Sequence, residues 1–488
     1  MYTHILPQLE KLAKQRVLCV GDVMLDRYVY GQVERISPEA PIPVLRVQRE
    51  AIMLGGCGNT VREVVALDGS VVLVSVIGDD QTGRDLKQQV GTMPQITPYL
   101  VTDNTRSTTI KIRYVADNQQ LLRTDHEDNK PVSAELEKLI LDHVNEALPD
   151  CDIVVLSDYA KGVLTDRVVS ETIKAATAAG KRVLVDPKGR NFSRYRGATL
   201  LTPNRKELAE ATGMVVSTVS DVEKAARALI AANNLQGVLA KLSADGICLV
   251  LKDQELQHFH AMAREVFDVS GAGDTVVATM ALALAGGLSP ADSAALASIA
   301  GYLVVGKIGT AVITREELAQ ELVRDQNRES EKKFATWEQA SEMAARWRKQ
   351  GLKVGFTNGC FDLIHPGHIA SIRQSRSNCD RLFIGLNSDA SVKRLGKGDD
   401  RPIQNENARA TVLAAMADVD GIVIFDQDTP LELIKTIRPD VLVKGSDYTV
   451  ETVVGAKEVM SWGGKVVLAQ LIEGHSTTAM IKRSRGNL

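Results

Sequence analysis

The sequence lacks a long apolar run, a paired-cysteine pattern and a strong excess of one charge. No apolar stretch is long enough to cross a bilayer, and residues 1–16 are polar and amphipathic, so we expect no signal peptide. The six cysteines are scattered and form no CxxC pair, which argues against a disulfide framework and suits a reducing cytoplasm. With a net charge of −3, neither nucleic acid nor an anionic membrane is expected as the main partner.

The length requires more than one domain. A chain of 488 residues is too long for a single hydrophobic core, and its 44% apolar and 24% charged residues are ordinary for globular proteins. Residues 315–333 are dense in charge, which indicates a helical tail that runs into a solvated linker. We therefore predict a first domain over residues 1–318, a linker over 319–344 and a second domain over 345–488.

Residues 268–275, DVSGAGDT, have the features of an anion-binding turn. Glycines allow the backbone N–H groups of Gly271, Ala272 and Gly273 to face one point, and the helix predicted to follow adds its positive end. A carboxylate at Asp274 would repel a bound phosphate, unless it accepts the proton of a hydroxyl that attacks this phosphate. The alternative is an ordinary glycine-rich turn, since the helix dipole favours an acidic residue at this place in any case.

Polar or charged residues recur directly after short apolar segments that are typical of strands. These segments are residues 17–20, 153–156, 182–185, 199–201 and 237–241. Open parallel α/β sheets bind ligands at the carboxyl ends of their strands. Each polar residue could instead be a turn or a helix cap. Taken together with the glycine-rich turn, however, these strand ends are poorly explained by capping alone.

Two segments near the N-terminus offer further ligand contacts. Gly55 and Gly56 precede a predicted helix start, where Asn59 could hydrogen-bond a ligand. Asp26 is predicted on the loop that follows the first strand. Residues 42–47 are typical of a short strand, and their proline favours an edge or a lid over the centre of a sheet.

Residues 108–115 alternate between apolar and basic side chains, as in a half-exposed strand. Lys111 and Arg113 share one face of this strand. The face is either a solvated surface or a clamp on a phosphate group of the substrate.

A second motif, TNGCFDLIHPGH at residues 357–368, follows an apolar strand. Pro366 suits the first position of a helix, so His365 and His368 flank a helix N-terminus, which attracts anions. Two imidazoles and the helix dipole could hold a nucleoside triphosphate and stabilise charge that builds on its phosphorus. A zinc site that includes Cys360 is an alternative, although no fixed set of further ligands is obvious, and capping or core histidines are another.

About residues 10–315 resemble the ribokinase-like carbohydrate kinases. The resemblance is carried by the Gly-Gly element at residues 55–59, by the Asn-x-x-Glu element at residues 204–207 and by residues 268–274. The Gly-Ala-Gly-Asp core of the last element is highly specific.

About residues 350–485 resemble the cytidylyltransferase-like nucleotidyltransferases. Their His-x-Gly-His motif matches residues 365–368, and their Ser-Thr-Thr element matches Ser476, Thr477 and Thr478. The three hydroxyls precede a predicted helix, whose N-terminus suits a phosphate group.

The order of the two parts is more restrictive than either part alone. A kinase followed by a nucleotidyltransferase resembles the bifunctional heptose-phosphate kinases and heptose 1-phosphate adenylyltransferases of Gram-negative bacteria. Two local departures are Cys57, where the family usually has alanine, and Ala240-Lys241 in place of the more usual Val-Thr. The segments that agree are residues 21–28, 35–41, 118–121, 156–162, 186–189 and 443–445.

The resemblance implies a fold and two reactions. The fold is α/β: a ribokinase-like three-layer domain with a small β lid, followed by a Rossmann-like nucleotidyltransferase domain. The first reaction phosphorylates D-glycero-β-D-manno-heptose 7-phosphate at C1, and the second transfers AMP to heptose 1-phosphate. Both use ATP. Mg²⁺ would bridge the ATP phosphates near Glu207, and the sequence identifies no metal-binding residue with certainty.

The resemblance also implies roles for individual residues. In the kinase, Asp274 is the base, and the N–H groups of residues 271–273 form the anion hole. The residues implied for kinase ATP binding are Asn204, Arg205, Lys206, Glu207, Ser243 and Gly246. Those implied for the sugar phosphate are Asp26, Gly55, Gly56, Asn59, Lys111 and Arg113. Those implied for adenylyl transfer are His365, His368, Thr357, Asn358, Gly359, Phe361, Asp362, Lys393, Ser476, Thr477 and Thr478.

A phosphatase must act between the two reactions, and no part of the chain looks like one, so a partner enzyme is implied. We also expect a homodimer that forms through the lid, in the cytoplasm. Two alternatives remain open: another sugar kinase fused to a cytidylyltransferase, and a non-catalytic sensor of sugar phosphates or nucleotides. A sensor would have no need of Asp274, His365 and His368.

Overall fold

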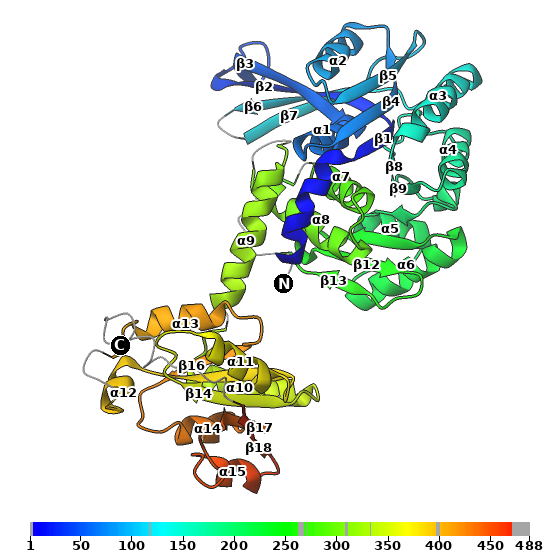
Figure 1. Cartoon of the computed structure of the whole chain (residues 1–488). Helices are drawn as coiled ribbons and strands as arrows, with labels where there is room; N and C mark the ends of the chain where they lie inside the picture. Colours follow the sequence, from blue (N-terminus) through cyan, green and yellow to red (C-terminus); the bar gives the residue numbers. More distant parts are fainter. Residues whose placement is uncertain are drawn as a thin grey trace. The chain divides into compact units, whose positions relative to one another are not determined.

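The computed structural model describes residues 3–116, 119–261, 268–269, 271–307, 311–331, 333–396 and 401–470 (Figure 1). Contacts within the chain divide it into two compact units, an N-terminal unit of residues 2–322 and a C-terminal unit that begins at Val323. Within the described ranges, no helix combines the length and the apolar character needed to span a membrane.

The described part of the N-terminal unit is built on a nine-stranded sheet in the order β13-β12-β11-β10-β9-β8-β1-β4-β5. All neighbours from β11 to β5 are parallel, and β12 and β13 form an antiparallel edge. The strands are β1 (Arg16–Gly21), β4 (Ser70–Gly78), β5 (Ile96–Asp103), β8 (Ile153–Ser157), β9 (Arg182–Asp186), β10 (Leu200–Leu201), β11 (Gly237–Lys241), β12 (Ile247–Leu251) and β13 (Gln257–Phe259).

Helices cover both faces of this sheet, which gives three layers. Alternate residues of β1 point to opposite faces, so Val17 and Cys19 join one core while Leu18 and Val20 join the other. The first core includes α1 (Cys57–Ala66), α2 (Gln81–Gly91), α7 (Ala272–Ala285), α8 (Pro290–Val304) and the 3₁₀ segment η1 (Thr3–Lys14). The second includes α3 (Ala134–Ala147), α4 (Asp166–Ala178), α5 (Arg205–Thr212) and α6 (Val219–Asn233).

A four-stranded sheet in the order β3-β2-β6-β7 forms the predicted lid. Its strands are β2 (Val23–Ile36), β3 (Pro43–Gly56), β6 (Ile110–Ala116) and β7 (Gln119–His126). The prediction of a short strand at residues 42–47 was wrong, because β3 continues for 14 residues and pairs with β2 along its length. The prediction that Asp26 lies on a loop was also wrong. Asp26 lies in β2, where β3 on one side and β6 on the other supply hydrogen-bonding partners.

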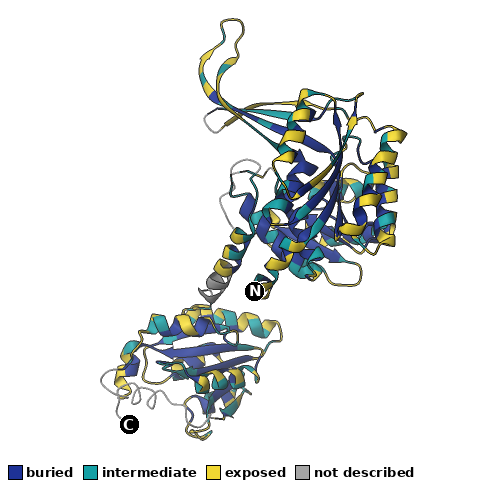
Figure 2. Ribbon diagram, turned by 45° about the horizontal axis from the view of Figure 1, so that its top comes forward, coloured by how far each residue is buried: buried dark blue, intermediate teal, exposed yellow. Residues whose placement is uncertain are grey.

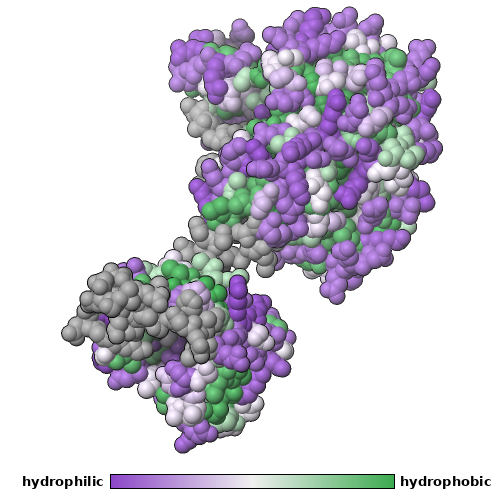
Figure 3. Space-filling model, viewed as in Figure 1, coloured by the Kyte–Doolittle hydropathy of each residue, from purple (hydrophilic) through white to green (hydrophobic). Residues whose placement is uncertain are grey.

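The outer part of the lid is exposed (Figure 2). It carries apolar side chains with large exposed fractions: Ile36 at 60%, Val47 at 51%, Leu121 at 43% and Leu122 at 56%. By contrast, hydrophilic residues dominate the face of the N-terminal unit seen in Figure 3, where apolar residues form small patches. Apolar side chains exposed on a sheet are candidates for a contact with another protein surface.

The C-terminal unit contains a parallel sheet in the order β16-β15-β14-β17-β18 within the described residues. Apolar cores on its two faces are covered by helices. The strands are β14 (Val354–Gly359), β15 (Arg381–Asn387), β16 (Gly421–Phe425), β17 (Val441–Gly445) and β18 (Lys465–Ala469). The helices are α10 (Trp337–Lys349), α11 (Pro366–Arg376), α12 (Asp389–Arg394), α13 (Glu406–Ala414), α14 (Leu431–Ile437) and α15 (Ala456–Ser461).

The segment predicted as a linker is largely helical. Helix α9 (Arg315–Glu331) precedes α10, whose residues Ala340 and Ala344 are fully buried in the core of the C-terminal unit. The packing of α10 therefore places the start of the second core before the predicted boundary at residue 345.

We predict that a fragment of residues 333–488 is more stable than one of residues 345–488. The shorter fragment lacks the part of α10 that packs Trp337, Ala340 and Met343 on the core. Burying a large apolar side chain contributes about 1.5–3 kcal/mol, so we expect a loss of roughly 3 kcal/mol or more in the free energy of unfolding. Urea titrations of both fragments measure this difference. Equal midpoints and slopes would show that α10 is dispensable for the core.

Candidate active sites

The carboxylate of Asp274 lies at the start of α7, with only 6% of the residue exposed. Its Oδ1 accepts hydrogen bonds from the Tyr159 hydroxyl at 2.8 Å and from Thr60 Oγ1 at 3.1 Å. Its Oδ2 accepts one from Asn59 Nδ2 at 2.9 Å. Asn59 and Thr60 lie on α1 and Tyr159 follows β8, so three side chains from two separate segments hold this carboxylate in place.

The environment of Asp274 makes it a stronger base than an ordinary aspartate. Burial, and next the negative charge of Asp186, raise the pKa of Asp274 to about 6. Hydrogen bonds from Asn59 and Tyr159 and the positive charge of Lys241 oppose this rise. A carboxylate with this pKa is ionised at neutral pH and accepts a proton more readily than an aspartate in water does, which suits a general base.

The turn before Asp274 starts α7 with a left-handed glycine. Gly271 is the N-cap of α7 with φ of 83°, a left-handed conformation that favours glycine. A methyl group on Gly271 would lie 2.6 Å from Asn59 Nδ2, so no larger residue fits there. The N–H of Ala272 makes only a long bond, 3.3 Å, to the Val269 carbonyl. Ser270 of this turn and the two apolar residues before it in the sequence, Val266 and Phe267, lie outside the described residues.

The sugar-binding residues predicted in the lid and in α1 are close to one another. Asp26 is buried and pairs with Arg113, whose Nη1 lies 2.6 Å from Asp26 Oδ1. Methyl groups on Gly55 and Gly56 would lie 2.4 Å from Asp26 Oδ2 and 2.4 Å from the Asp22 carbonyl, respectively. The glycine pair is therefore required by close packing around these two aspartates, whatever else it binds.

Arg62 contributes to this site, although sequence reasoning did not identify it. Its Nη1 lies 3.3 Å from Asn59 Oδ1, and this bond orients the amide so that Asn59 Nδ2 faces Asp274. The sequence did contain a signal for this contact: Arg62 is three residues after Asn59 on a helix, so the two side chains share one face. Lys111 lies nearby on β6, where burial lowers its pKa although Asp26 opposes this.

The Asn-x-x-Glu element forms a helix cap. Asn204 Oδ1 accepts the Glu207 N–H at 2.9 Å, and Glu207 Oε2 accepts the Asn204 N–H at 3.0 Å. Glu207 Oε1 also lies 2.9 Å from Lys188 Nζ. The element thus fixes the N-terminus of α5 at the carboxyl end of β10. The carboxylate of Glu207 also remains beside the ammonium group of Lys188.

The other residues predicted for kinase ATP binding lie around the same sheet edge. Arg205 pairs with Asp245 at 2.5 Å. Ser243 and Gly246 belong to the turn after β11 and have positive φ values of 55° and 87°. Lys206 is exposed on α5 and lies 3.8 Å from Glu210.

A buried aspartate supports the loop that carries Tyr159. The Asp22 carboxylate accepts the N–H groups of Tyr159, Lys161 and Val163 at 2.9, 3.1 and 3.0 Å. Burial, followed by repulsion from Asp158, raises the pKa of Asp22. The sequence predicts polar residues after the strand of residues 17–20, but it does not show this role of Asp22, which depends on residues 137 to 141 positions away.

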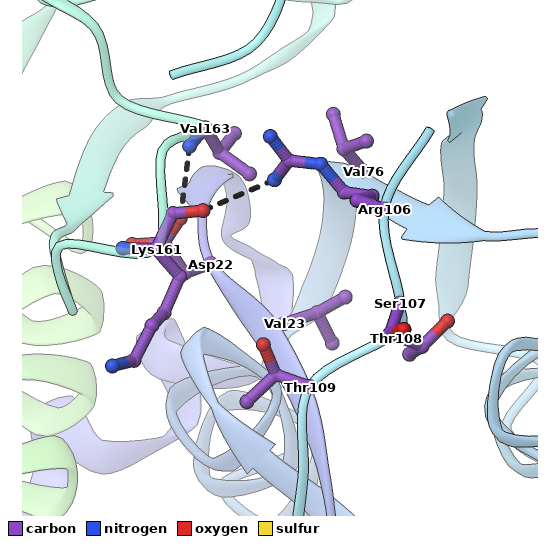
Figure 4. Close-up of a pocket in the computed structure, with 9 residues that line it drawn as sticks. All are labelled: Asp22, Val23, Val76, Arg106, Ser107, Thr108, Thr109, Lys161 and Val163. Carbon is purple, nitrogen blue, oxygen red and sulfur yellow. Dashed lines mark hydrogen bonds between the residues drawn. The ribbon is translucent and has the colours of Figure 1, made fainter. Parts of the chain in front are cut away.

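A small pocket adjoins this loop at the start of β6 (Figure 4). Arg106 reaches across it and donates to the Lys161 carbonyl at 3.0 Å, while its Nε lies 3.0 Å from Asp103. The lining residues are Asp22, Val23, Val76, Arg106, Ser107, Thr108, Thr109, Lys161 and Val163.

The two histidines of the C-terminal unit form a stacked pair. His365 is the N-cap of α11, and its ring centroid lies 3.9 Å from that of His368, with 24° between the ring planes. Phe361 contacts His368 from another side, with ring centroids 5.2 Å apart. Burial, and next repulsion from His365, lower the pKa of His368 to about 4. His368 is therefore neutral at physiological pH in the free protein.

Asp362 supports the loop over this site. Its carboxylate is buried and accepts bonds from Arg401 Nε at 3.0 Å and from the N–H groups of Ile403 and Gln404 at 2.8 and 3.1 Å. It thus positions the segment from residue 401 to 404. Arg409, which is 2% exposed, extends the same network toward β14 and β15.

The structure describes some of the remaining residues predicted for the second site and leaves others outside the described ranges. Thr357, Asn358 and Gly359 end β14. Lys444 donates to the Asn358 carbonyl and side chain at 3.1 and 3.0 Å, a contact that sequence reasoning missed. Lys393 is exposed in the last turn of α12. Ser476, Thr477 and Thr478 lie outside the described residues.

The two sites define an enzyme in which a carbohydrate kinase is joined to a nucleotidyltransferase. The model of the pfkB family carbohydrate kinases matches residues 14–317, and the cytidylyltransferase-like model matches residues 356–483. Bifunctional protein HldE of Paramagnetospirillum magneticum is 54% identical over 483 residues, 99% of each chain, and that of Caulobacter vibrioides is 53% identical over 96% of this chain and 97% of its own. The chain belongs to this family of bifunctional HldE proteins.

Solved structures agree with the fold of the N-terminal unit. Phosphofructokinase-2 from Escherichia coli in complex with potassium aligns with a TM-score of 0.55 at 21% identity, covering 64% of this chain and 98% of its own. Ribokinase of Arabidopsis thaliana complexed with ribose and ATP aligns with a TM-score of 0.51 at 20% identity, covering 63% and 99%. The predicted ribokinase-like fold and the predicted second α/β domain are thereby confirmed.

We predict that kinase kcat/KM falls about tenfold for each pH unit below about 6. This prediction takes Asp274 as the general base, which must be ionised; its pKa is raised to about 6, so protonation below that pH removes the base. The Tyr159→Phe variant loses a hydrogen bond that lowers this pKa, so its acid limb should move to higher pH. If the acid limb came from titration of the substrate phosphates instead, it would lie at the same pH in the variant and in the wild type. An unmoved limb would contradict the prediction.

Proposed function

We propose that the N-terminal unit transfers the γ-phosphoryl group of ATP to the C1 hydroxyl of D-glycero-β-D-manno-heptose 7-phosphate. The C-terminal unit then transfers AMP from a second ATP to heptose 1-phosphate, which gives ADP-heptose and pyrophosphate. The observation that carries the first reaction is the buried carboxylate of Asp274, which three side chains from two segments hold beside the glycine-rich turn at the start of α7. The full-length relatives, whose name describes them as bifunctional, support two reactions in one chain.

In the kinase reaction, the C1 oxygen of the sugar forms a bond to the γ-phosphorus. The bond from this phosphorus to the oxygen that bridges the β- and γ-phosphates breaks, and ADP leaves. The hydroxyl proton goes to the carboxylate of Asp274. The N–H groups of Gly271, Ala272 and Gly273, with the positive end of α7, stabilise the transferred group.

The sugar is held by Asp26, Asn59 and the backbone at the glycine pair of residues 55–56. Arg113 is already paired with Asp26, so its charge stabilises that carboxylate. Lys111, the other basic residue on this strand, is therefore our candidate for the 7-phosphate. Burial lowers its pKa, which means that binding an anion would favour its charged form.

ATP for this reaction lies along α5 and the turn after β11, against residues 204–207, Ser243 and Gly246. In the described residues no group of three or more metal-ligating side chains occurs, so Mg²⁺ would be held mainly by the ATP phosphates. Glu207 fits this arrangement as a carboxylate whose contacts with Lys188 and with the Asn204 N–H leave lone pairs for a metal-bound water. When bound, Mg²⁺ neutralises charge on the phosphates.

In the second reaction, a phosphate oxygen of heptose 1-phosphate bonds to the α-phosphorus of ATP. The bond to the oxygen that bridges the α- and β-phosphates breaks, and pyrophosphate leaves. The nucleophile is already an anion, so no base is needed, and the site has to position its reactants and stabilise charge. His365 and His368 at the start of α11 suit this role, with residues 357–359 on the nucleotide and Lys393 on a phosphate.

The two reactions also imply a setting for the protein. The first product is a bisphosphate and the second substrate is a monophosphate, so a separate phosphatase acts between them. The exposed apolar side chains Ile36, Val47, Leu121 and Leu122 support a homodimer that forms through the lid. The ATP requirement and the scattered free cysteines support a cytoplasmic location.

The deciding experiment is incubation with heptose 7-phosphate and either ATP or CTP, with and without an added phosphatase. With ATP alone, mass analysis should find the heptose bisphosphate. With ATP and phosphatase it should find ADP-heptose. If the enzyme formed CDP-heptose from CTP in preference to ADP-heptose from ATP, the proposed nucleotide would be wrong. If no phosphorylated sugar beyond the substrate formed, the kinase assignment would be wrong.

We predict that Asp274→Asn and His368→Ala separate the two activities. The first variant should lose about 10³-fold or more of kinase kcat while adenylyl transfer stays within about twofold, because it removes a general base from one site only. The second should do the reverse. Each reaction is measured separately with purified sugar phosphates. Parallel loss of both activities in a folded variant would contradict the existence of two independent sites.

A further inference from the structure

Three neighbouring strand ends form an ion-pair cluster beside the anion turn. Lys241, the last residue of β11, places Nζ 2.5 Å from Asp186 Oδ1 at the end of β9. The same oxygen accepts a hydrogen bond from Thr202 Oγ1 at 2.9 Å, just after β10. The side chains of Lys241 and Asp186 are each 15% exposed. The ammonium group is thus held in one place and is largely shielded from solvent.

The ammonium group of Lys241 faces the turn that is proposed to receive the phosphoryl group. A methyl group on Gly273 would lie 3.2 Å from Nζ of Lys241, and 3.9 Å from its Cε. The influence of both charged groups on Asp274 agrees with this closeness: Asp186 raises the pKa of Asp274, and Lys241 lowers it. Base, anion turn and ammonium group therefore lie together at the start of α7.

We propose that Lys241 is a further catalytic residue of the kinase, whose ammonium group binds the γ-phosphoryl group during its transfer. This inference rests on the proposed kinase function. The transferred group carries its charge on three equatorial oxygens, and in a shielded site a fixed cation stabilises this charge strongly. An ammonium group has three N–H donors, and the bond to Asp186 uses one of them.

Lys241 takes no part in the bond changes of the reaction. The sugar oxygen bonds to the γ-phosphorus, the bond to the bridging oxygen breaks, and the proton goes to Asp274, while Lys241 keeps all its protons. Asp186 is a positioning residue, because its bond to Nζ fixes the ammonium group. The partial charge of the helix N-terminus is about half an elementary charge, so a whole charge at Gly273 adds substantially to it.

The competing explanation is a purely structural ion pair that only neutralises Asp186. Such a pair would affect the stability of the sheet edge, but it would not distinguish ATP from ADP. A cation at the γ-phosphate must do so, because ADP lacks this group. The preference for ATP over ADP is therefore a readout that a structural role would not change, and it requires no sugar substrate.

The test uses the full-length variants Lys241→Met, Lys241→Gln and Lys241→Arg, with Lys174→Met as a matched control on the exposed surface of α4. We expect the Met and Gln variants to lose about 10²-fold or more in kinase kcat, as for removal of one group that stabilises transition-state charge. Their affinity for ATP should fall about tenfold by calorimetry while their affinity for ADP stays within twofold. The Arg variant should retain most of the ATP preference, and the control should match the wild type.

The pH profile gives an independent check. Loss of Lys241 should move the acid limb of kinase kcat/KM above pH 6, whereas Asp186→Asn should move it below, because the two charges act on Asp274 in opposite directions. Adenylyl transfer and the thermal melt of each variant establish that it is folded. An unchanged ATP-to-ADP affinity ratio with kcat within threefold of wild type would overturn the role of Lys241. Failure of the wild type to phosphorylate the sugar would instead overturn the proposed kinase function, while the nucleotide-affinity ratio would still test Lys241.

Discussion

The proposed chemistry of the N-terminal unit depends on one constraint: a carboxylate must stay buried, ionisable and correctly oriented beside the proposed site for phosphate. Asp274 meets it because hydrogen bonds from Asn59, Thr60 and Tyr159 replace the water that burial removes. These bonds offset only part of the cost of burial, so the pKa remains raised to about 6. Incomplete compensation is useful here, since full compensation would leave a weak base and none would leave a protonated acid.

Much of the surrounding structure serves to keep that carboxylate in place. Asp22 fixes the loop that carries Tyr159, and Arg62 orients the amide of Asn59. Gly271 leaves room for the same amide, because a methyl group there would lie 2.6 Å from its nitrogen. The site therefore combines contacts between segments that are far apart in the chain. A disturbance in α1 or in the loop after β8 would reach the base even without touching the substrate.

Local signals made part of this arrangement predictable from sequence. The parallel strands followed from continuous apolar runs, and the anion turn followed from glycines placed between a strand and a helix. The lid was harder, because β2 continues directly from the main sheet and only its pairing with β3 and β6 makes it a strand. Tyr159 and Lys241 were not assigned to the site, because their roles appear only when strand ends are brought together. The sequence shows which polar residue follows a strand, but it does not show which residue that side chain contacts.

The two active sites solve opposite electrostatic problems in one chain. A neutral hydroxyl is a poor nucleophile, so the first site raises the proton affinity of a carboxylate. A sugar phosphate is already an anion, so the second reaction needs no base, and the neutral imidazole of His368 can serve there as a hydrogen-bond donor. The pKa values agree with this division: burial raises that of Asp274 to about 6 and lowers that of His368 to about 4. In both cases burial disfavours the charged form, and the type of side chain decides whether the result is a better base or an uncharged donor.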